Sequence, residues 1–299
     1  MSLSEELLAL FGKNVTHDAQ GINARMHFFG SVPANENSHS RQIEPAALRP
    51  KVVALVSING GVGRSTLVTA LSSGLQRHGE SVVALDLDPQ NALLHHFGVN
   101  SSSPGIGRTS LAHGQWAPLQ QPGFAGCQVI PFGTVDIEQQ QSLERWLKHE
   151  PQWLARRLAS MGLSERQTVI IDTPAGNNVY FHQALSVSDV VLVVVQADAA
   201  CLGTLDHLDV LLAPHLECER PPAVHVVVNQ VDESSAFSLD MLEALKQRLG
   251  KAPLEVHRDM KINEALAFAT DPLDNVASRL VSDDFNQICQ LLKAPKRQA

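Results

Sequence analysis

A glycine-rich segment constrains the fold of this chain more than any other feature. Residues 59–66 read Asn-Gly-Gly-Val-Gly-Arg-Ser-Thr. Residues 52–58, directly before it, are apolar and rich in valine, which is typical of a buried strand. Apolar residues follow it at helical spacing: Leu67, Ala70, Leu71 and Leu75. A strand, a glycine loop and a helix in this order are the setting that a phosphate-binding loop requires.

The chemistry of such a loop comes from its backbone. Glycines allow N–H groups to turn inward around an anion, and the positive end of the helix dipole adds to the attraction. The hydroxyl of Ser65 stands where a Mg²⁺ ligand is expected. Two positions depart from the general pattern, because Ile58 replaces its first glycine and Arg64 replaces its lysine. A plain tight turn is the alternative for a glycine run after a strand.

Apolar runs and helical patterns alternate through the rest of the chain. Strands are predicted at 81–85, 129–132, 168–172, 190–195 and 224–228. Helices are predicted at 146–158, 205–212, 239–249 and 285–292. A long Gly/Ser/Pro-rich excursion covers 101–126. Alternation of this kind predicts an α/β fold with three layers and a mostly parallel central sheet, which binds ligands at the carboxyl ends of its strands.

Three acids are expected at that ligand-binding edge. Asp86 and Asp88 follow one predicted strand, and Asp172 ends another in the sequence Ile-Ile-Asp-Thr-Pro. A lone acid at a strand end usually caps a helix or faces solvent. Three acids beside a phosphate-binding loop instead predict a site for Mg²⁺ and its waters, because Mg²⁺ prefers oxygen ligands. Asp86 and Asp88 lie two apart, so on extended backbone they face the same side.

Several segments together resemble the ParA/MinD group of deviant Walker A ATPases. Four occur in the order of that group: residues 60–66, Asp-Leu-Asp-Pro-Gln-Asn at 86–91, Ile-Asp-Thr-Pro at 171–174 and Val-Asn-Gln-Val-Asp at 228–232. Within the group, the chain resembles most the BcsQ family, the MinD-like proteins of bacterial cellulose-synthesis operons. The variant loop carries this second resemblance, together with residues 130–133, 137–140 and 256–259. The first 50 residues lie outside it.

The resemblance implies a role for each site residue. The phosphates of ATP would be held by Asn59, Gly60, Gly61, Val62, Gly63, Arg64, Ser65 and Thr66. Ser65 would ligate Mg²⁺, and Asp86 and Asp172 would hold the water shell of the metal. Asp88 would position the hydrolytic water, with Arg64 as the second catalytic residue. Asn229 would read adenine through its amide, with a strand-end turn as the alternative, and residues 256–259 would close over the base or ribose.

Two departures from the group bear on hydrolysis. Its signature lysine, which reaches across a nucleotide-sandwich homodimer to the phosphates of the partner, corresponds to Asn59. An amide can form a hydrogen bond there but supplies no charge. The ordinary Walker lysine corresponds to Arg64, whose planar guanidinium is not a simple replacement for an ammonium. We therefore expect nucleotide binding and, at most, slow ATP hydrolysis.

Charge and composition indicate which partners and which cellular compartment to expect for this protein. The net charge is −8, which gives no overall basic field for DNA or anionic lipid. Four cysteines are scattered without the pairing of a zinc or redox site. No apolar run reaches the roughly 20 residues of a membrane span, and the acidic N-terminus is unlike a signal peptide. We expect a cytoplasmic protein that reaches the inner membrane or cell pole only through partners.

The chain divides into three predicted parts. Residues 1–50 form a flexible extension with a short amphipathic helix and a polar linker, residues 51–293 form the nucleotide-binding domain, and residues 294–299 form a basic tail. The apolar stripe of the last helix could anchor a membrane, but its ordinary width favours packing on the sheet.

The resemblance leads to one function and two alternatives. The first is a dimerising, nucleotide-dependent regulator that supports assembly or positioning of a cellulose-synthesis and secretion complex, without direct DNA binding. The alternatives are a ParA-type partition ATPase acting on DNA and a scaffold that keeps its nucleotide without hydrolysing it. The acidic balance and the missing signature lysine argue against the DNA-binding alternative.

Overall fold

A central sheet organises the protein in the computed structural model, which describes residues 49–274, 276 and 278–293. Its strands lie in the order β3-β4-β2-β5-β1-β6-β7-β8. They are β1 (Lys51–Val56), β2 (Ser81–Asp86), β3 (Gln121–Pro122), β4 (Gln128–Ile130), β5 (Gln167–Asp172), β6 (Val190–Gln196), β7 (Ala223–Val231) and β8 (Leu254–His257). All neighbouring pairs run parallel except β3 and β4. The predicted mostly parallel sheet is confirmed.

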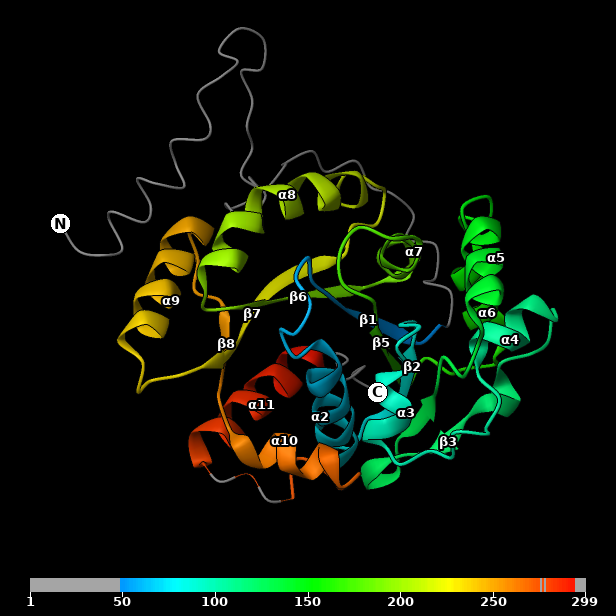
Figure 1. The fold of residues 1–299 in the computed structure, drawn as a ribbon, viewed down its shortest axis with the longest axis horizontal. Helices are drawn as coiled ribbons and strands as arrows, with labels where there is room; N and C mark the ends of the chain where they lie inside the picture. Colours follow the sequence, from blue (N-terminus) through cyan, green and yellow to red (C-terminus); the bar gives the residue numbers. More distant parts are fainter. Residues whose placement is uncertain (1–48, 275, 277, 294–299) are drawn as a thin grey trace, which may run out of the picture.

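Helices cover both faces of this sheet and complete three layers. They are α2 (Arg64–Arg77), α3 (Ala92–His96), α4 (Ile106–Leu111), α5 (Ile137–Leu147), α6 (Trp153–Ser160), α7 (Val179–Val187), α8 (Ala199–Leu216), α9 (Ala236–Leu249), α10 (Met260–Ala267) and α11 (Arg279–Leu292). Figure 1 shows α2, α10 and α11 on one side of the sheet, with α7 and α8 on the opposite side. The predicted extension and basic tail lie outside the described residues, apart from Arg49 and Pro50.

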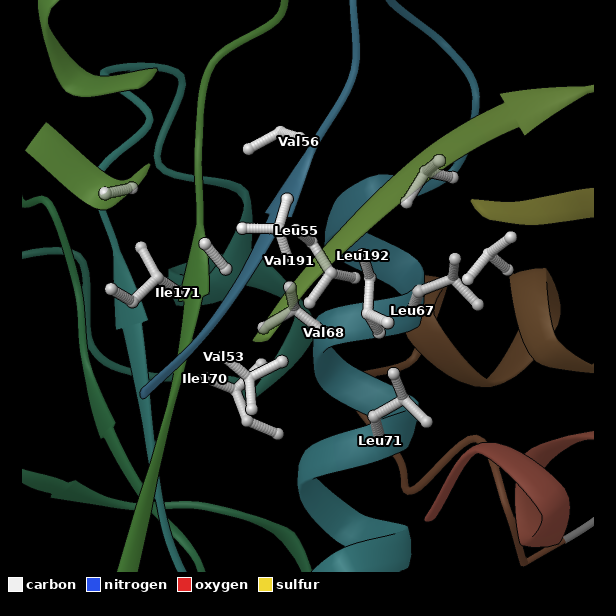
Figure 2. Packing of buried hydrophobic residues seen from close by; sticks show 14 of the residues in the cluster. Val53, Leu55, Val56, Leu67, Val68, Leu71, Ile170, Ile171, Val191 and Leu192 are labelled. Carbon is white, nitrogen blue, oxygen red and sulfur yellow. The ribbon is translucent and has the colours of Figure 1, made fainter. Parts of the chain in front are cut away.

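The core lies where β1 meets α2. All residues of β1 after Lys51 are buried, as expected for a central strand with helices on both faces. Side chains of α2 such as Leu67, Val68 and Leu71 pack against the strands (Figure 2). Burial of one such side chain stabilises the fold by about 1.5–3 kcal/mol. This packing fixes the first turn of α2, and with it the end of the glycine loop.

Two regions differ from the sequence prediction. The helix expected over 146–158 is two helices, α5 and α6, and that prediction is wrong. Pro151 disfavours helical geometry in the residue before it and has no N–H to continue the helix. The excursion at 101–126 contains α4 and β3, which its composition concealed. An added Cβ at Gly105 would lie 2.4 Å from backbone atoms of Gly133, so glycine is required for α4 to approach residues 132–133.

The last helix packs on the domain. Phe285, Ile288 and Leu292 of α11 are buried, and α11 contacts α2 and β8. The apolar stripe therefore belongs to the core, as the width of the stripe predicted. Across the described residues, no helix combines the length and the hydropathy needed to span a membrane.

Candidate functional site

The glycine loop joins β1 to α2 at the carboxyl edge of the sheet. Gly61 (φ +76°) and Gly63 (φ +84°) have left-handed backbone conformations, and Gly63 is the N-cap of α2. The N–H of Leu67 donates to the carbonyl of Gly63 at 2.9 Å. An added Cβ at Gly60 or Gly61 would meet no atom within 4 Å, so this side of the loop is free of described protein atoms. The loop therefore has space for a ligand beside its backbone.

The other side of the loop is packed against β7. Asn229, at the register position opposite Gln196, donates from Nδ2 to the carbonyl of Val62 at 2.8 Å. A Cβ at Gly63 would lie only 2.4 Å from the same Nδ2. The Asn229 side chain is buried and binds the loop from the end of β7. Recognition of adenine by this amide stays a prediction.

Two of the predicted acids lie next to the loop on neighbouring strands. Asp86 and Asp172 are register partners, and β5 lies between β2 and β1, so Asp172 lies nearer to the loop. Asp86 accepts hydrogen bonds from the backbone N–H groups of Asp88 (2.9 Å) and Leu93 (3.0 Å). Burial and the charge of Asp172 raise the pKa of Asp86 well above its usual range. The Asp86 carboxyl thus already fixes the turn that follows its own strand.

Asp172 has the least satisfied carboxylate of the site. The side chain is fully buried, and neither oxygen has a hydrogen-bond partner of good geometry among the described residues, while the Ser65 hydroxyl and the Thr173 N–H lie near enough to stabilise its charge weakly. Burial raises the pKa of Asp172, nearby Arg64 and Ser65 lower it, and the resulting pKa is about 6. An ionised carboxylate that accepts no strong hydrogen bond is costly in the protein interior, and the Arg64 guanidinium 3.7 Å away offsets only part of that cost. A cation bound near Asp172 would therefore stabilise its ionised form.

These donors fit a hydrated Mg²⁺ better than a metal held by protein alone. The described residues contain no group of three or more His, Cys, Asp or Glu arranged to hold a metal ion. Mg²⁺ keeps several waters and is usually bound through one or two carboxylates together with substrate phosphates. Asp172 beside Ser65 and the open glycine loop provides that arrangement. Asp88, also buried, accepts a hydrogen bond from the N–H of Gln90 at 2.9 Å.

Arg64 extends into the carboxylate cluster. Its Nε donates to the carbonyl of Thr173 at 2.7 Å, and a terminal nitrogen donates to the hydroxyl of Ser57. Two further N···O distances, to Asp88 Oδ2 and Asp172 Oδ1, are 3.7 Å each. The side chain is only 7% exposed. Arg64 thus donates hydrogen bonds to Ser57 and Thr173 with the acids at longer range, and its contact with phosphate stays a prediction.

The side chain of Asn59 is bound by α8, which lies on the face of the sheet opposite to α2. Its Oδ1 accepts a hydrogen bond from the Thr204 hydroxyl of α8 at 2.9 Å, and its carbonyl accepts one from Ser57 at 2.7 Å. Thr66 follows Ser65 in the first turn of α2. Asn59, which occupies the position of the signature lysine, is therefore bound to α8. Contact of Asn59 with the phosphates of a partner subunit stays a prediction.

Sequence reasoning did not find the residues that organise the site. Ser57 and Thr173 hold Arg64, Thr204 holds Asn59, and Asn178 shapes the loop after Asp172. The amide of Asn178 donates to three carbonyls of that loop, those of Pro174, Ala175 and Gly176. Asn178 stands directly before α7 and accepts from the Phe181 N–H, so an N-cap pattern could have identified it. The other contacts join distant segments and leave no local signal.

The segment predicted to close over the base lies at the end of β8. Both the N–H and Nδ1 of His257 contact Asp284 of α11, at 2.9 and 2.8 Å. Arg258 lies 3.8 Å from Asp232, and Asp259 caps α10. These contacts fix the segment against α11 and α10. Contact with a nucleotide base or ribose stays a prediction.

The strand order, the glycine loop before α2 and the acids at the ends of β2 and β5 define a P-loop NTPase of the ParA/MinD group. Among solved structures, the septum site-determining protein MinD of Pyrococcus horikoshii, complexed with Mg-ADP, aligns with a TM-score of 0.66 at 20% identity. That alignment covers 82% of this chain and 96% of that one. A family model described as "Cellulose biosynthesis protein BcsQ" matches residues 50–288. The chain belongs to this family.

Curated relatives agree with that assignment. The cellulose biosynthesis protein BcsQ of Escherichia coli K12 is 29% identical over 219 residues, covering 72% of this chain and 83% of that protein. The chromosome partitioning protein ParA of Caulobacter vibrioides is 26% identical over 243 residues, covering 73% of this chain and 84% of that protein. The similarity therefore spans both the BcsQ family and the wider ParA/MinD group.

Proposed function

We propose that this protein binds ATP with Mg²⁺ and acts as a dimerising, MinD-like regulator of a bacterial cellulose-synthesis and secretion complex. The observation that carries nucleotide binding is the open glycine loop beside Asp172, whose buried oxygens have no hydrogen-bond partner of good geometry among the described residues. Membership of the BcsQ family supports the link to cellulose synthesis. The protein would work in the cytoplasm and reach the inner membrane or cell pole through partners of that complex.

The chain would supply the contacts for this function from three segments. Backbone N–H groups of residues 60–66 would hold the phosphates, and Ser65 would contribute a hydroxyl ligand to Mg²⁺. Asp172, with Asp86 behind it, would orient waters of the metal shell. When bound, Mg²⁺ neutralises phosphate charge and orients the terminal phosphate. Asp88 would orient the attacking water, while Asn59 supplies no charge, so hydrolysis would be slow.

The first test uses Gly63→Val. A β-branched side chain at this left-handed position would meet Asn229 and force the loop away from its conformation. We expect calorimetry to show ATP–Mg²⁺ affinity reduced by at least about 100-fold, or about 2.8 kcal/mol. Gly162→Val is the matched control, because Gly162 also has positive φ, with no atom within 4 Å of an added Cβ. It should bind ATP like the wild type.

A folded Gly63→Val variant that binds ATP normally would show that the phosphate site lies elsewhere.

The cellulose role needs a separate measurement in the native host. Deletion of the gene should abolish or sharply reduce extracellular cellulose, and the wild-type gene should restore it. Normal cellulose together with chromosome or plasmid loss, and ATP-dependent DNA binding by the purified protein, would favour a partition ATPase instead.

A further inference from the structure

The guanidinium of Arg64 lies between two carboxylates of the proposed metal site. Its Nε is 3.7 Å from Asp172 Oδ1, and its Nη2 is 3.7 Å from Asp88 Oδ2. These distances exceed hydrogen-bonding range, so neither carboxylate oxygen is occupied by the guanidinium. The charge of Arg64 is nevertheless close enough to act on both acids, because the group is buried and poorly screened.

Two segments accept hydrogen bonds from this guanidinium and hold it in place. Thr173, directly after β5, accepts from Nε at 2.7 Å, and Ser57, directly after β1, accepts from a terminal nitrogen. Ser57 is itself oriented because its hydroxyl donates to the Asn59 carbonyl at 2.7 Å. Arg64 begins α2, so its backbone also belongs to the glycine loop. One side chain therefore links the loop to the acids.

We propose that Arg64 is a resident counter-cation of the carboxylate cluster, and that it competes with a divalent metal for Asp88 and Asp172. This inference rests on the proposed function, since it concerns regulation of the same site. A second cation near Asp172 would be repelled by the guanidinium and would gain less from carboxylates that Arg64 already partly neutralises. The cluster should therefore bind a free divalent metal poorly.

Competition would make nucleotide and metal bind together. The phosphates of a bound nucleotide offer the guanidinium another anionic partner on the open side of the loop. Movement of Arg64 toward them would reduce the positive charge beside Asp172 and so favour a metal there. The same residue would thus discourage metal binding alone and favour binding of metal with nucleotide.

The test measures Mn²⁺ binding without nucleotide, using the electron paramagnetic resonance signal of free Mn²⁺. Arg64→Met should raise Mn²⁺ affinity by at least about 10-fold over the wild type, or about 1.4 kcal/mol. Arg156→Met also removes one positive charge, from an exposed residue of α6, and should leave Mn²⁺ affinity unchanged. Adding Asp172→Asn to Arg64→Met should remove the gain, which would place the metal at this cluster.

A second variant keeps the charge and protects the test against misfolding. Ser57→Ala removes one hydrogen-bond acceptor of the guanidinium, and circular dichroism should show both variants folded. The Ser57→Ala variant should raise Mn²⁺ affinity, but by less than the Arg64→Met variant does. Unchanged or weaker Mn²⁺ binding in both folded variants would overturn the inference. Failure of wild-type ATP binding would instead overturn the proposed function, because the Mn²⁺ measurement uses no nucleotide.

Discussion

At the scale of single residues, the glycine loop of this protein places its positive charge differently from the glycine loops of the ParA/MinD group. Arg64 carries the cation and lies among Asp88 and Asp172, whereas Asn59 brings an uncharged amide bound to Thr204. The sequence alone identified both positions as departures. It could not identify their contacts, because Arg64 and Thr173 are 109 positions apart and Asn59 and Thr204 are 145 apart. Local patterns carry no information about pairs of that separation.

Asn59→Lys tests whether the missing charge limits hydrolysis. In the nucleotide-sandwich dimer that we expect, a lysine here would meet the phosphates of the partner subunit. One well-aimed donor stabilises the transition state by about 1.4 kcal/mol or more. The variant should therefore hydrolyse ATP at least about 10-fold faster than the wild type. Phosphate release per dimer gives the rate, and sedimentation with and without ATP gives the oligomer.

The matched control for this variant is Thr204→Val. It removes the hydrogen bond to Asn59 without adding charge, so it should leave hydrolysis slow. Fast turnover by the wild type would contradict the slow-switch interpretation. A monomeric wild type at saturating ATP would also contradict it. An Asn59→Lys variant that dimerises without gaining activity would favour a scaffold that keeps its nucleotide.

At the scale of elements, a histidine pair joins α7 to α8. His182 Nδ1 and His215 Nε2 are 3.1 Å apart, and His182 Nε2 lies 2.8 Å from Asn177 Oδ1. The pair lines a cavity of about 480 Å³ to which Lys148 also contributes. Burial lowers the pKa of both histidines, and for His215 the neighbouring His182 adds to the effect. A hydrogen bond between two ring nitrogens requires a neutral acceptor.

This pair should make stability sensitive to acid. Below pH 6.5 the unfolded chain binds more protons at these positions than the folded chain, until the lowered pKa values are reached. The free energy of unfolding therefore falls as the pH drops through that window. His215→Gln should remove part of the decrease in Tm between pH 7.5 and 5.5, because one of the groups that takes up a proton on unfolding is then absent.

His207→Gln is the control for the acid response, because His207 is an exposed residue of the same helix. Its Tm should follow the wild-type pH profile. Two other half-buried histidines with lowered pKa values, His96 and His225, contribute equally to all variants. An unchanged pH profile in His215→Gln, measured by differential scanning calorimetry, would rule out the pair as a source of acid sensitivity.

Most strands could be predicted from sequence, whereas interrupted helices and elements in glycine-rich segments could not. The strands β1, β2, β4, β5, β6 and β7 were predicted because apolar runs between helices have few alternatives. The split between α5 and α6 was missed, since apolar spacing continues across Pro151 and concealed the break. Helix α4 was missed because its glycines are typical of a loop. Only their close packing against residues 132–133 explains them.

At the scale of the whole molecule, the described residues form a domain whose first strand begins at Lys51. Asp189 receives both the Arg49 guanidinium, at 3.0 Å, and the backbone N–H of Val52, at 2.8 Å. These contacts fix the start of β1 through residues of the described part of the chain. The sequence predicts a domain boundary at residue 50 from the change in composition, and this boundary stays a prediction.

Deletion of residues 1–45 should therefore leave thermal stability nearly unchanged, within about 2 °C, because the deleted segment precedes Arg49 and β1. Cellulose output in the host should nevertheless fall, since we expect the extension to recruit partners. Thermal denaturation of the purified variant and quantification of cellulose check the two parts. A large decrease in Tm would show that apolar residues such as Leu3, Leu7 and Phe11 pack on the domain.

The contact between Gly63 and Asn229 also limits how this protein can diverge. Gly63 cannot accept a larger side chain while Asn229 keeps its present position, since an added Cβ on the glycine would lie 2.4 Å from the amide nitrogen. The two residues are 166 positions apart in the chain, yet they share one small volume. Descendant sequences can therefore enlarge residue 63 only after residue 229 has become smaller or the end of β7 has moved away from the loop.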